Sequence, residues 1–381
     1  MTSGYDVVGY GRMMADRARM DAYARALEAA VRPGSVVLDI GTGTGVMAML
    51  ACRFGARRVF ALEPADAVQA AREIARGNGV ADRIEFIQEL STRVTLPERA
   101  DVIVSDLRGS LPLFQGIIDS LADARERHLA PGGVMIPRAD HLMAAPVDAP
   151  GAWAEVAAPW EECALGFDME AARRRAVHTV RRVELDPGEQ LATAARWATL
   201  DYRTRTDPNV AGTAEWTVER AGRMHGLAVW FQAELADGIS FHTGPGTRTT
   251  YRTSFFPWAA PVEVEPGDTV WGELSARRVG DDYVWGWSAR VDRSGREPTE
   301  MRHSTFLAAP PSLARLRRRD DGFRPTLGDE GRVEAMALGM MDGATPLGDI
   351  AAALHAAFPR LFPTREAALT RAGQVAERLA G

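Results

Sequence analysis

Up to Pro137, short apolar runs take turns along the chain with longer segments in which apolar residues recur at helical spacing. Short continuous apolar runs predict buried strands at 36–40, 58–63, 83–88, 100–105 and 133–136. Around them, apolar residues recur at helical spacing and predict helices at 12–31, 46–53, 65–77 and 112–128. Strands that alternate with helices are typical of a parallel α/β sheet.

Beyond Pro137 the pattern changes to short β-type runs rich in Val, Thr, Trp and Tyr. These runs lie at 180–204, 214–235, 248–256, 268–278 and 282–291. Pro-Gly, Gly-Asp and Gly-Pro turns separate them, and they predict an antiparallel all-β module, either a sandwich or a barrel. A helical insert over about 159–177 interrupts its start. A linker at 308–328 is followed by three predicted helices at 329–341, 346–357 and 364–379.

The length agrees with a division into three parts. A chain of 381 residues corresponds to two or three domains. We place them at 1–138, 139–307 and 308–381. Because 46% of the residues are hydrophobic and 25% are charged, the composition is that of a globular protein and excludes disordered, collagenous and coiled-coil classes.

Charge and cysteine content restrict the partners of the chain. The net charge of −6 does not favour non-specific nucleic-acid binding. The only cysteines, Cys52 and Cys163, lack metal-ligand spacing, so neither a disulfide framework nor a metal site is expected. The N-terminus has no signal-peptide pattern, and no apolar run approaches the roughly 20 residues that cross a membrane. We therefore expect a soluble, cytoplasmic protein with no membrane or nucleic-acid partner.

A glycine-rich turn follows the first predicted strand. It comprises Asp39, Gly41, Thr42, Gly43 and Gly45. Glycines let the backbone approach a ligand closely, but a dehydrogenase fingerprint would place its third glycine at Val46. An acidic residue ahead of G-x-G-x-G suits S-adenosylmethionine, which has no pyrophosphate. Glu63, 22 residues after Gly41, ends the second strand where a carboxylate accepts both ribose hydroxyls. The sequence therefore predicts an S-adenosylmethionine site.

Four further segments give the chain a specific resemblance. They are M-M-A-D-R-A-R at 13–19, G-A-R-R-V-F-A-L-E at 55–63, L-A-P-G-G-V-M-I-P at 129–137, and Trp160 with G-F-D-M at 166–169. Together they resemble the protein arginine methyltransferases over about residues 10–300. The resemblance implies a class I methyltransferase fold: a Rossmann-like parallel sheet followed by an antiparallel β-barrel that carries a helical dimerisation arm. The three helices predicted after 328 would add a small helical domain at the C-terminus, which is not part of this resemblance.

The resemblance also assigns roles to residues of the first domain. Arg19 matches the arginine that binds the carboxylate of the methyl donor, a role that suits the forked guanidinium. The family's adenine-binding acidic residue is replaced at Ser91 and Thr92, with Glu89 as a nearby alternative. The arm, at about 155–180, docks on a second subunit in the family and implies a homodimer.

The reactive loop of the family carries two glutamates that grip the substrate guanidinium. In the matching stretch 105–115, Asp106 holds the first position and Gln115 the second, while Arg108 between them is a candidate substrate contact. Only the Asp106 carboxylate remains, whereas the family's two carboxylates together neutralise the substrate guanidinium, orient it and accept its proton. We expect Asp106 and Gln115 to form the catalytic pair and to bind a guanidinium more weakly.

The family's barrel-side T-H-W motif falls on Thr249-Thr250-Tyr251, so its histidine is absent. Thr250 and Tyr251 become candidate substrate contacts. Nearby His242 either faces the site or is an ordinary surface or core histidine, and the second interpretation is the simpler one. Only Tyr5 and Tyr10 remain of the family's N-terminal aromatic helix.

The last 55 or so residues lie outside the arginine methyltransferase pattern. Residues 332–350 faintly resemble a winged-helix module, of the kind found in small peptide-binding chaperones of quinone-cofactor and modified-peptide biosynthesis. A plain three-helix lid or interface is the alternative. The arginine run at 315–319 suits a solvated linker better than nucleic acid.

Three functions are compatible with these patterns. The altered clamp favours an S-adenosylmethionine-dependent methyltransferase that acts on a nitrogen of a small molecule or peptide, in specialised metabolism. A protein arginine N-methyltransferase with a modified clamp is the first alternative. A non-catalytic scaffold that binds S-adenosylmethionine is the second.

Overall fold

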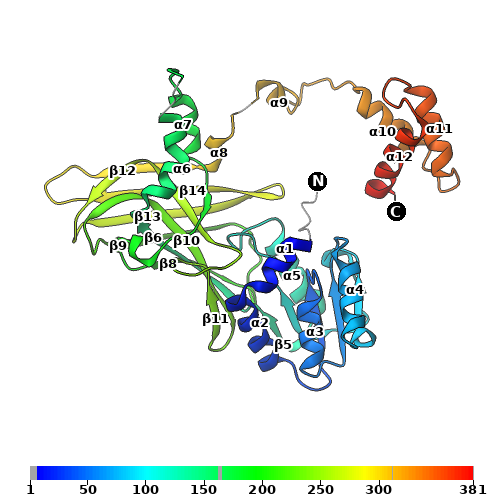
Figure 1. Cartoon of the computed structure of the whole chain (residues 1–381), viewed down its shortest axis with the longest axis horizontal. Coiled ribbons are helices and arrows are strands. Elements are labelled where there is room, and N and C mark those ends of the chain that lie inside the picture. Colours follow the sequence, from blue (N-terminus) through cyan, green and yellow to red (C-terminus); the bar gives the residue numbers. More distant parts are fainter. Residues whose placement is uncertain (1–6, 162–164, 311, 381) are drawn as a thin grey trace. The chain divides into compact units, whose positions relative to one another are not determined.

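The computed structural model describes residues 7–161, 165–310 and 312–380. It contains two compact units, Met1–Pro310 and Pro311–Gly381, which are considered separately (Figure 1). The boundary lies three residues beyond the predicted one. Tyr5 and Cys163 fall outside the described residues.

The first unit begins with a five-stranded parallel sheet in the order β3-β2-β1-β4-β5. Its strands are β1 (Val36–Ile40), β2 (Arg58–Leu62), β3 (Ile84–Ile87), β4 (Ala100–Ser105) and β5 (Leu129–Ile136). The helices are α1 (Val7–Ala15), α2 (Arg17–Ala30), α3 (Val46–Arg53), α4 (Ala67–Gly77) and α5 (Ile117–His128), with single 3₁₀ turns η1 (Ala81–Arg83) and η2 (Ser91–Arg93). All five residues of β1 are buried, as its continuous apolar run predicts. The predicted parallel α/β sheet is confirmed.

The helix predicted at 12–31 is in fact two helices that meet at Asp16. The Asp16 side chain accepts the Arg19 backbone N–H and caps α2, so the chain restarts a helix there instead of continuing α1. Asp and Asn satisfy free backbone N–H groups at helix starts, and apolar spacing alone does not register that break.

Two antiparallel sheets form the second part of this unit. One has the order β7-β12-β10-β6-β8, with β11 paired to β10, and the other has the order β15-β14-β13-β9. Their strands are β6 (Ala139–Val147), β7 (Arg181–Val183), β8 (Ala195–Asp201), β9 (Val210–Thr217), β10 (Gly222–Ala236), β11 (Ile239–His242), β12 (Thr253–Val264), β13 (Thr269–Val279), β14 (Asp282–Asp292) and β15 (Thr299–Ser304), with a 3₁₀ turn η3 (Pro187–Glu189).

Aromatic side chains hold these two sheets together in a barrel-like domain. Phe256 of β12 meets Trp285 and Trp287 of β14 edge-on, with ring centroids 5.5 and 5.2 Å apart. The indole N–H of Trp216 on β9 donates to the carbonyl of Ala144 on β6 over 3.1 Å. The predicted all-β module is therefore confirmed.

The helical insert consists of α6 (Pro150–Glu161) and α7 (Glu170–Ala176), which project from the barrel-like domain (Figure 1). It begins nine residues earlier than predicted, because Pro159 lies inside the last turns of α6 and does not open a helix. Leu165 and Phe167, between the two helices, are exposed by 80% and 69%. A short helix α8 (Thr305–Ala308) ends the unit.

The second unit contains α9 (Leu313–Arg317), α10 (Asp329–Gly339), α11 (Leu347–Ala357) and α12 (Arg365–Leu379). The last three confirm the predicted helices and enclose a small core around Val333, Ile350, Leu354 and Val375. Residues 312–380 include no strand. The wing that a winged-helix module requires is thus missing from them, and the three-helix alternative fits instead.

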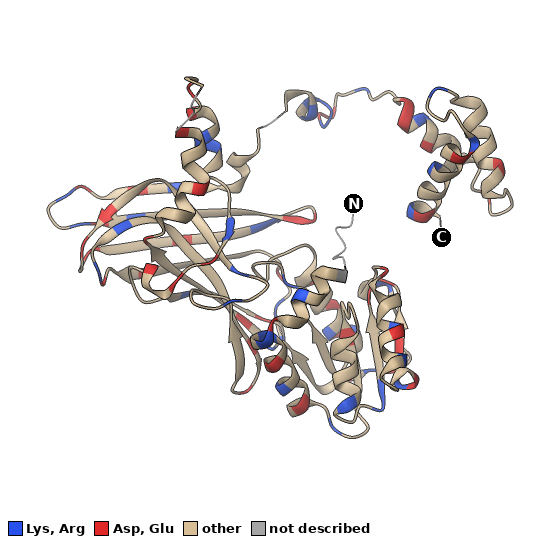
Figure 2. Cartoon of the chain, viewed as in Figure 1, with Lys and Arg blue, Asp and Glu red and all other residues tan. Residues whose placement is uncertain are grey.

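Acidic and basic residues are interspersed along the ribbon in Figure 2. Within the described residues, no helix is long and apolar enough to cross a membrane.

Candidate active site

Three groups of predicted site residues follow the ends of three neighbouring strands. The glycine turn follows β1, Glu63 follows β2, and Asp106 follows β4. The strand order reverses between β1 and β4, so the crevice at their carboxyl ends is where an open α/β sheet binds its ligand.

The glycine turn has a backbone that only glycine adopts easily. Gly41, Gly43 and Gly45 have φ angles of 74°, 54° and 83°. A Cβ added to Gly43 would lie 2.6 Å from a ring carbon of Tyr10, and one added to Gly41 would meet the side chain of Leu107. Tyr10 of α1 and Leu107 of the β4 loop therefore cover the turn directly.

Asp39 supports this turn from inside. Its Oδ2 accepts the Thr42 hydroxyl at 2.6 Å and the Ala48 backbone N–H, in the first turn of α3, at 3.0 Å. Burial raises the pKa of Asp39 to about 7, although both hydrogen bonds favour the ionised form. Asp39 and Thr42 thus fix the start of α3 and the shape of the turn.

Glu63 lies across from the turn and is buried. Its Oε2 accepts the Gly43 N–H and its Oε1 accepts the Ala65 N–H, both at 3.0 Å. Each oxygen keeps a lone pair for a further donor, as a ribose diol would require. This arrangement fits a nucleoside whose ribose lies beside Gly43.

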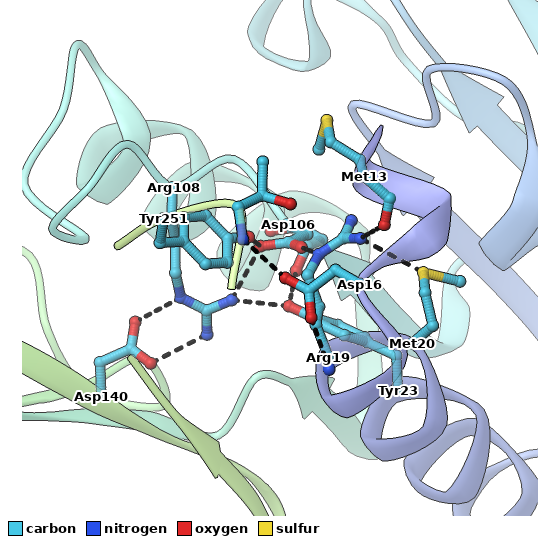
Figure 3. Close-up of polar contacts among 11 residues, drawn as sticks. Met13, Asp16, Arg19, Met20, Tyr23, Asp106, Arg108, Asp140 and Tyr251 are labelled. Atoms are coloured by element: carbon cyan, nitrogen blue, oxygen red, sulfur yellow. Dashed lines mark hydrogen bonds and ion pairs between the residues drawn. The ribbon is translucent and has the colours of Figure 1, made fainter. Parts of the chain in front are cut away.

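Arg19 and Asp106 form a buried ion pair at the centre of the site (Figure 3). The Arg19 Nε donates to Asp106 Oδ2 at 2.5 Å, and their side chains are 4% and 6% exposed. Arg19 Nη1 donates to the Met13 carbonyl at 2.8 Å, while Nη2 has no hydrogen-bond partner among the described residues. Nη2 is therefore available to a carboxylate ligand.

Arg108 approaches the same carboxylate from the other side. Its Nη1 donates to Asp106 Oδ1 at 2.9 Å and to the Tyr23 hydroxyl at 2.7 Å. Its Nε and Nη2 make a forked pair with Asp140 on β6, at 2.8 and 2.9 Å. The Tyr202 hydroxyl donates to Asp140 at 2.6 Å. Arg108 thus uses four of its five N–H groups within the protein, which leaves one N–H for its predicted role as a substrate contact.

The two guanidiniums control the ionisation of Asp106. Burial alone would raise its pKa, but Arg19 and Arg108, together with the Tyr251 hydroxyl bond, hold the pKa of the Asp106 carboxyl below its ordinary value. Asp106 is therefore an anion that orients cations and hydrogen-bond donors, and it is a weak proton acceptor.

The barrel-side loop also reaches Asp106. The Tyr251 hydroxyl donates to Asp106 Oδ1 at 2.5 Å, so Tyr251 contacts the loop after β4 from the position that matches the family's histidine motif. The Thr250 backbone N–H donates to Asp16 at 2.9 Å. His242, by contrast, lines a groove of about 700 Å³ against α2, and its Nδ1 accepts the Gly244 N–H. The structure follows the simpler interpretation, a surface histidine apart from the Asp106 network.

Other predicted residues lie outside this network. Gln115 is exposed at a φ of 48° and makes no hydrogen bond to the described residues. Glu89 accepts the Leu90 N–H at 2.7 Å, and Ser91 is buried while Thr92 is exposed. These three residues follow β3 on the same sheet edge as Glu63. Across the described part of the chain, no group of three His, Cys, Asp or Glu side chains could hold a metal ion.

Sequence reasoning missed Tyr23, Asp140 and Tyr202. Tyr23 lies one helical turn after Arg19, a spacing that places both on one face of α2 and could have identified it. Asp140 is the second residue of the largely apolar strand β6 and is fully buried, a placement that marks a paired charge. Nothing local to Tyr202 indicates its partner, which lies 62 residues away.

Two family models match the chain in succession. The model described as "Ribosomal protein L11 methyltransferase (PrmA)" matches residues 23–137, and "Arginine methyltransferase oligomerization subdomain" matches residues 141–285. The first spans the parallel sheet and the second most of the antiparallel domain.

The curated relatives include protein arginine N-methyltransferases. Protein arginine N-methyltransferase PRMT10 of rice (Oryza sativa subsp. japonica) is 44% identical over 137 residues, which cover 35% of this chain and 36% of the relative. Protein arginine N-methyltransferase 6 of Xenopus tropicalis is 26% identical over 289 residues, covering 71% of this chain and 84% of the relative. The match to the rice protein thus spans about a third of that protein's length.

Solved structures share the fold. The Trypanosoma brucei PRMT1 enzyme–prozyme heterotetrameric complex with AdoHcy has a TM-score of 0.72 at 21% identity, covering 77% of this chain and 97% of its own. Arabidopsis thaliana protein arginine methyltransferase 10, in an open conformation, has a TM-score of 0.68 at 24% identity, covering 79% and 98%. The fold is that of a class I methyltransferase with an added barrel-like domain. The chain is protein arginine methyltransferase-like in both parts of its first unit.

Proposed function

We propose that this chain is an S-adenosylmethionine-dependent N-methyltransferase. The observation that supports it most is the convergence of the glycine turn, Glu63 and Arg19 with Asp106 at one sheet edge. Glu63 would hold the ribose, and Arg19 Nη2 would hold the donor carboxylate. The bound donor supplies an electrophilic methyl group, while the protein aligns the acceptor nitrogen and excludes water.

An arginine side chain of a peptide or protein is the acceptor that the relatives support, because those named are protein arginine N-methyltransferases. No comparison supports the small-molecule acceptor in specialised metabolism that the altered clamp favoured. Asp106 provides the anion for a guanidinium, and Gln115 contributes no charge.

The test is transfer of a labelled methyl group from S-adenosylmethionine to arginine-containing peptides, with matched peptides in which lysine replaces arginine. Label on the arginine peptides alone supports the proposal. Donor binding by calorimetry without transfer to any peptide or amine favours the non-catalytic scaffold. No donor binding refutes the proposed function.

We also propose that the arm formed by α6 and α7 docks on a second copy of the chain. Support comes from the oligomerization-subdomain match and from exposed Leu165 and Phe167 between those helices. Sedimentation of the protein should give a dimer, and Phe167→Asp should give a monomer. A wild-type monomer at micromolar concentration would contradict this assembly.

A further inference from the structure

The Asp106 carboxylate has nearly all of its hydrogen-bonding capacity in use. A carboxylate offers about four lone-pair positions, two on each oxygen. Oδ1 accepts both the Tyr251 hydroxyl and Arg108 Nη1, while Oδ2 accepts Arg19 Nε. A forked guanidinium needs one position on each oxygen. Oδ1 has none left, so an incoming guanidinium cannot make the forked contact while Arg108 and Tyr251 both stay in place.

Arg108 is itself a guanidinium, held at this carboxylate by strong anchors. The forked bond to Asp140 fixes its plane, and the Tyr23 hydroxyl takes a further contact. The aromatic ring of Phe231 lies 5.2 Å from the guanidinium carbon of Arg108, and Arg108 is only 6% exposed. Because Asp106 is two positions earlier in the same loop, the Arg108 guanidinium is held beside its carboxylate at a high local concentration.

We propose that Arg108 acts as a tethered competitor for the acceptor guanidinium at Asp106, and so determines the specificity of this site. The inference rests on the proposed function, since it concerns the acceptor of that reaction. Arg108 fills the Oδ1 position and adds a positive charge that repels a second guanidinium. Removing it leaves one free position on each oxygen of Asp106, as a forked contact requires.

The test uses the double variant Arg108→Met/Asp140→Asn, because removing Arg108 alone would leave Asp140 buried without its cation. Methionine keeps apolar contact with the Phe231 ring, and the asparagine oxygen still accepts from Tyr202. Calorimetry with S-adenosylhomocysteine bound measures the affinity for acetyl-Gly-Gly-Arg-Gly-Gly-amide and for the same peptide with lysine. The arginine peptide should bind at least about tenfold more tightly to the double variant than to wild type. The lysine peptide, which has no fork, should gain less.

Two further variants keep the result interpretable. Arg108→Gln/Asp140→Asn, which is also neutral at both positions, should shift arginine-peptide affinity in the same direction and replaces the methionine double variant if the latter does not fold. Tyr251→Phe also frees a position on Oδ1 but leaves the Arg108 charge in place, so it should not improve arginine binding. Equal gains in Tyr251→Phe and the double variant would overturn the proposal.

The proposal is also overturned if wild type and the folded Arg108 variants bind the arginine peptide equally, or if lysine gains as much as arginine. The same titrations report S-adenosylhomocysteine binding. A wild-type protein that does not bind S-adenosylhomocysteine refutes the proposed function. If the wild-type protein binds S-adenosylhomocysteine but the neutral variants gain no affinity for the arginine peptide, only the role of Arg108 is refuted.

Discussion

Replacing Asp106 with asparagine tests how the donor and acceptor halves of the site are linked. In the proposed function Arg19 Nη2 binds the donor carboxylate, while Nε of the same guanidinium is bonded to Asp106 at 2.5 Å. The two carboxylates therefore share one guanidinium and repel each other. Asp106→Asn keeps the shape of the side chain and removes its charge, so the donor carboxylate no longer shares Arg19 with a second anion.

The contact geometry sets the size of the effect. Both side chains of the Arg19–Asp106 pair are at most 6% exposed, so solvent screens the bond little. A second carboxylate about 8 Å away, in an effective dielectric of about 20, is repelled by about 2 kcal/mol, so removing the Asp106 charge predicts a donor affinity roughly tenfold or more higher in the variant. The same substitution leaves two buried arginines with less compensation and should lower the free energy of unfolding by about 3–5 kcal/mol.

Calorimetry with two nucleosides separates these effects. S-adenosylhomocysteine carries the amino-acid carboxylate, whereas 5′-methylthioadenosine shares its nucleoside but lacks that end. Asp106→Asn should tighten binding of the first about tenfold and leave the second within about twofold of wild type. Methyl transfer should fall, because the acceptor loses its anionic partner. Unchanged binding of S-adenosylhomocysteine, or equal shifts for both nucleosides, would refute this coupling of the two carboxylates through Arg19.

Two other predictions concern the donor site and the barrel-like domain. Glu63→Ala should weaken both nucleosides at least about tenfold by removing the ribose contacts, and unaltered binding of 5′-methylthioadenosine would contradict the placement of the ribose. Burial, together with neighbouring His178, lowers the pKa of His303 to about 4. His303 of the unfolded chain, with an ordinary pKa of about 6.5, therefore takes up a proton at a higher pH than His303 of the folded chain. The stability that neutral His303 contributes is complete above about pH 6.5 and falls by about 3 kcal/mol as the pH drops toward 4. Urea unfolding at pH 7 and 4.5 measures this loss, and His303→Phe should reduce it; an equal loss in that variant would exclude His303.

Much of the fold could be predicted from local pattern, because buried parallel strands are continuous apolar runs. Val36–Ile40 and Ala100–Ser105 match the observed β1 and β4 residue for residue. The errors occur where a side chain overrides periodicity. Asp16 caps a new helix inside an apolar pattern, and Pro159 is accommodated inside α6. Neither event changes the spacing of apolar residues, so the pattern could not show it.

The donor half of the site was more predictable than the acceptor half. The glycine turn, Glu63 and Arg19 are read from short stretches whose local structure brings them to one sheet edge. Arg108, by contrast, lies in a loop that the sequence predicts to contact the substrate, and its partner Asp140 lies 32 residues later on β6. Only the packing of the antiparallel domain on the parallel sheet shows that the Arg108 charge is already satisfied.

Arg108 therefore has two roles that cannot vary independently. Its forked bond to Asp140 joins the loop after β4 to the first strand of the barrel-like domain, and its Nη1 occupies a position on the Asp106 carboxylate. A neutral residue at position 108 would open the acceptor site but leave a buried carboxylate, which costs several kcal/mol unless position 140 also changes. Residues 108 and 140 should thus change together, and Asp140→Asn with Arg108 retained should destabilise the protein more than the double variant does. Acceptor choice at this site is tied to the contact between the two domains.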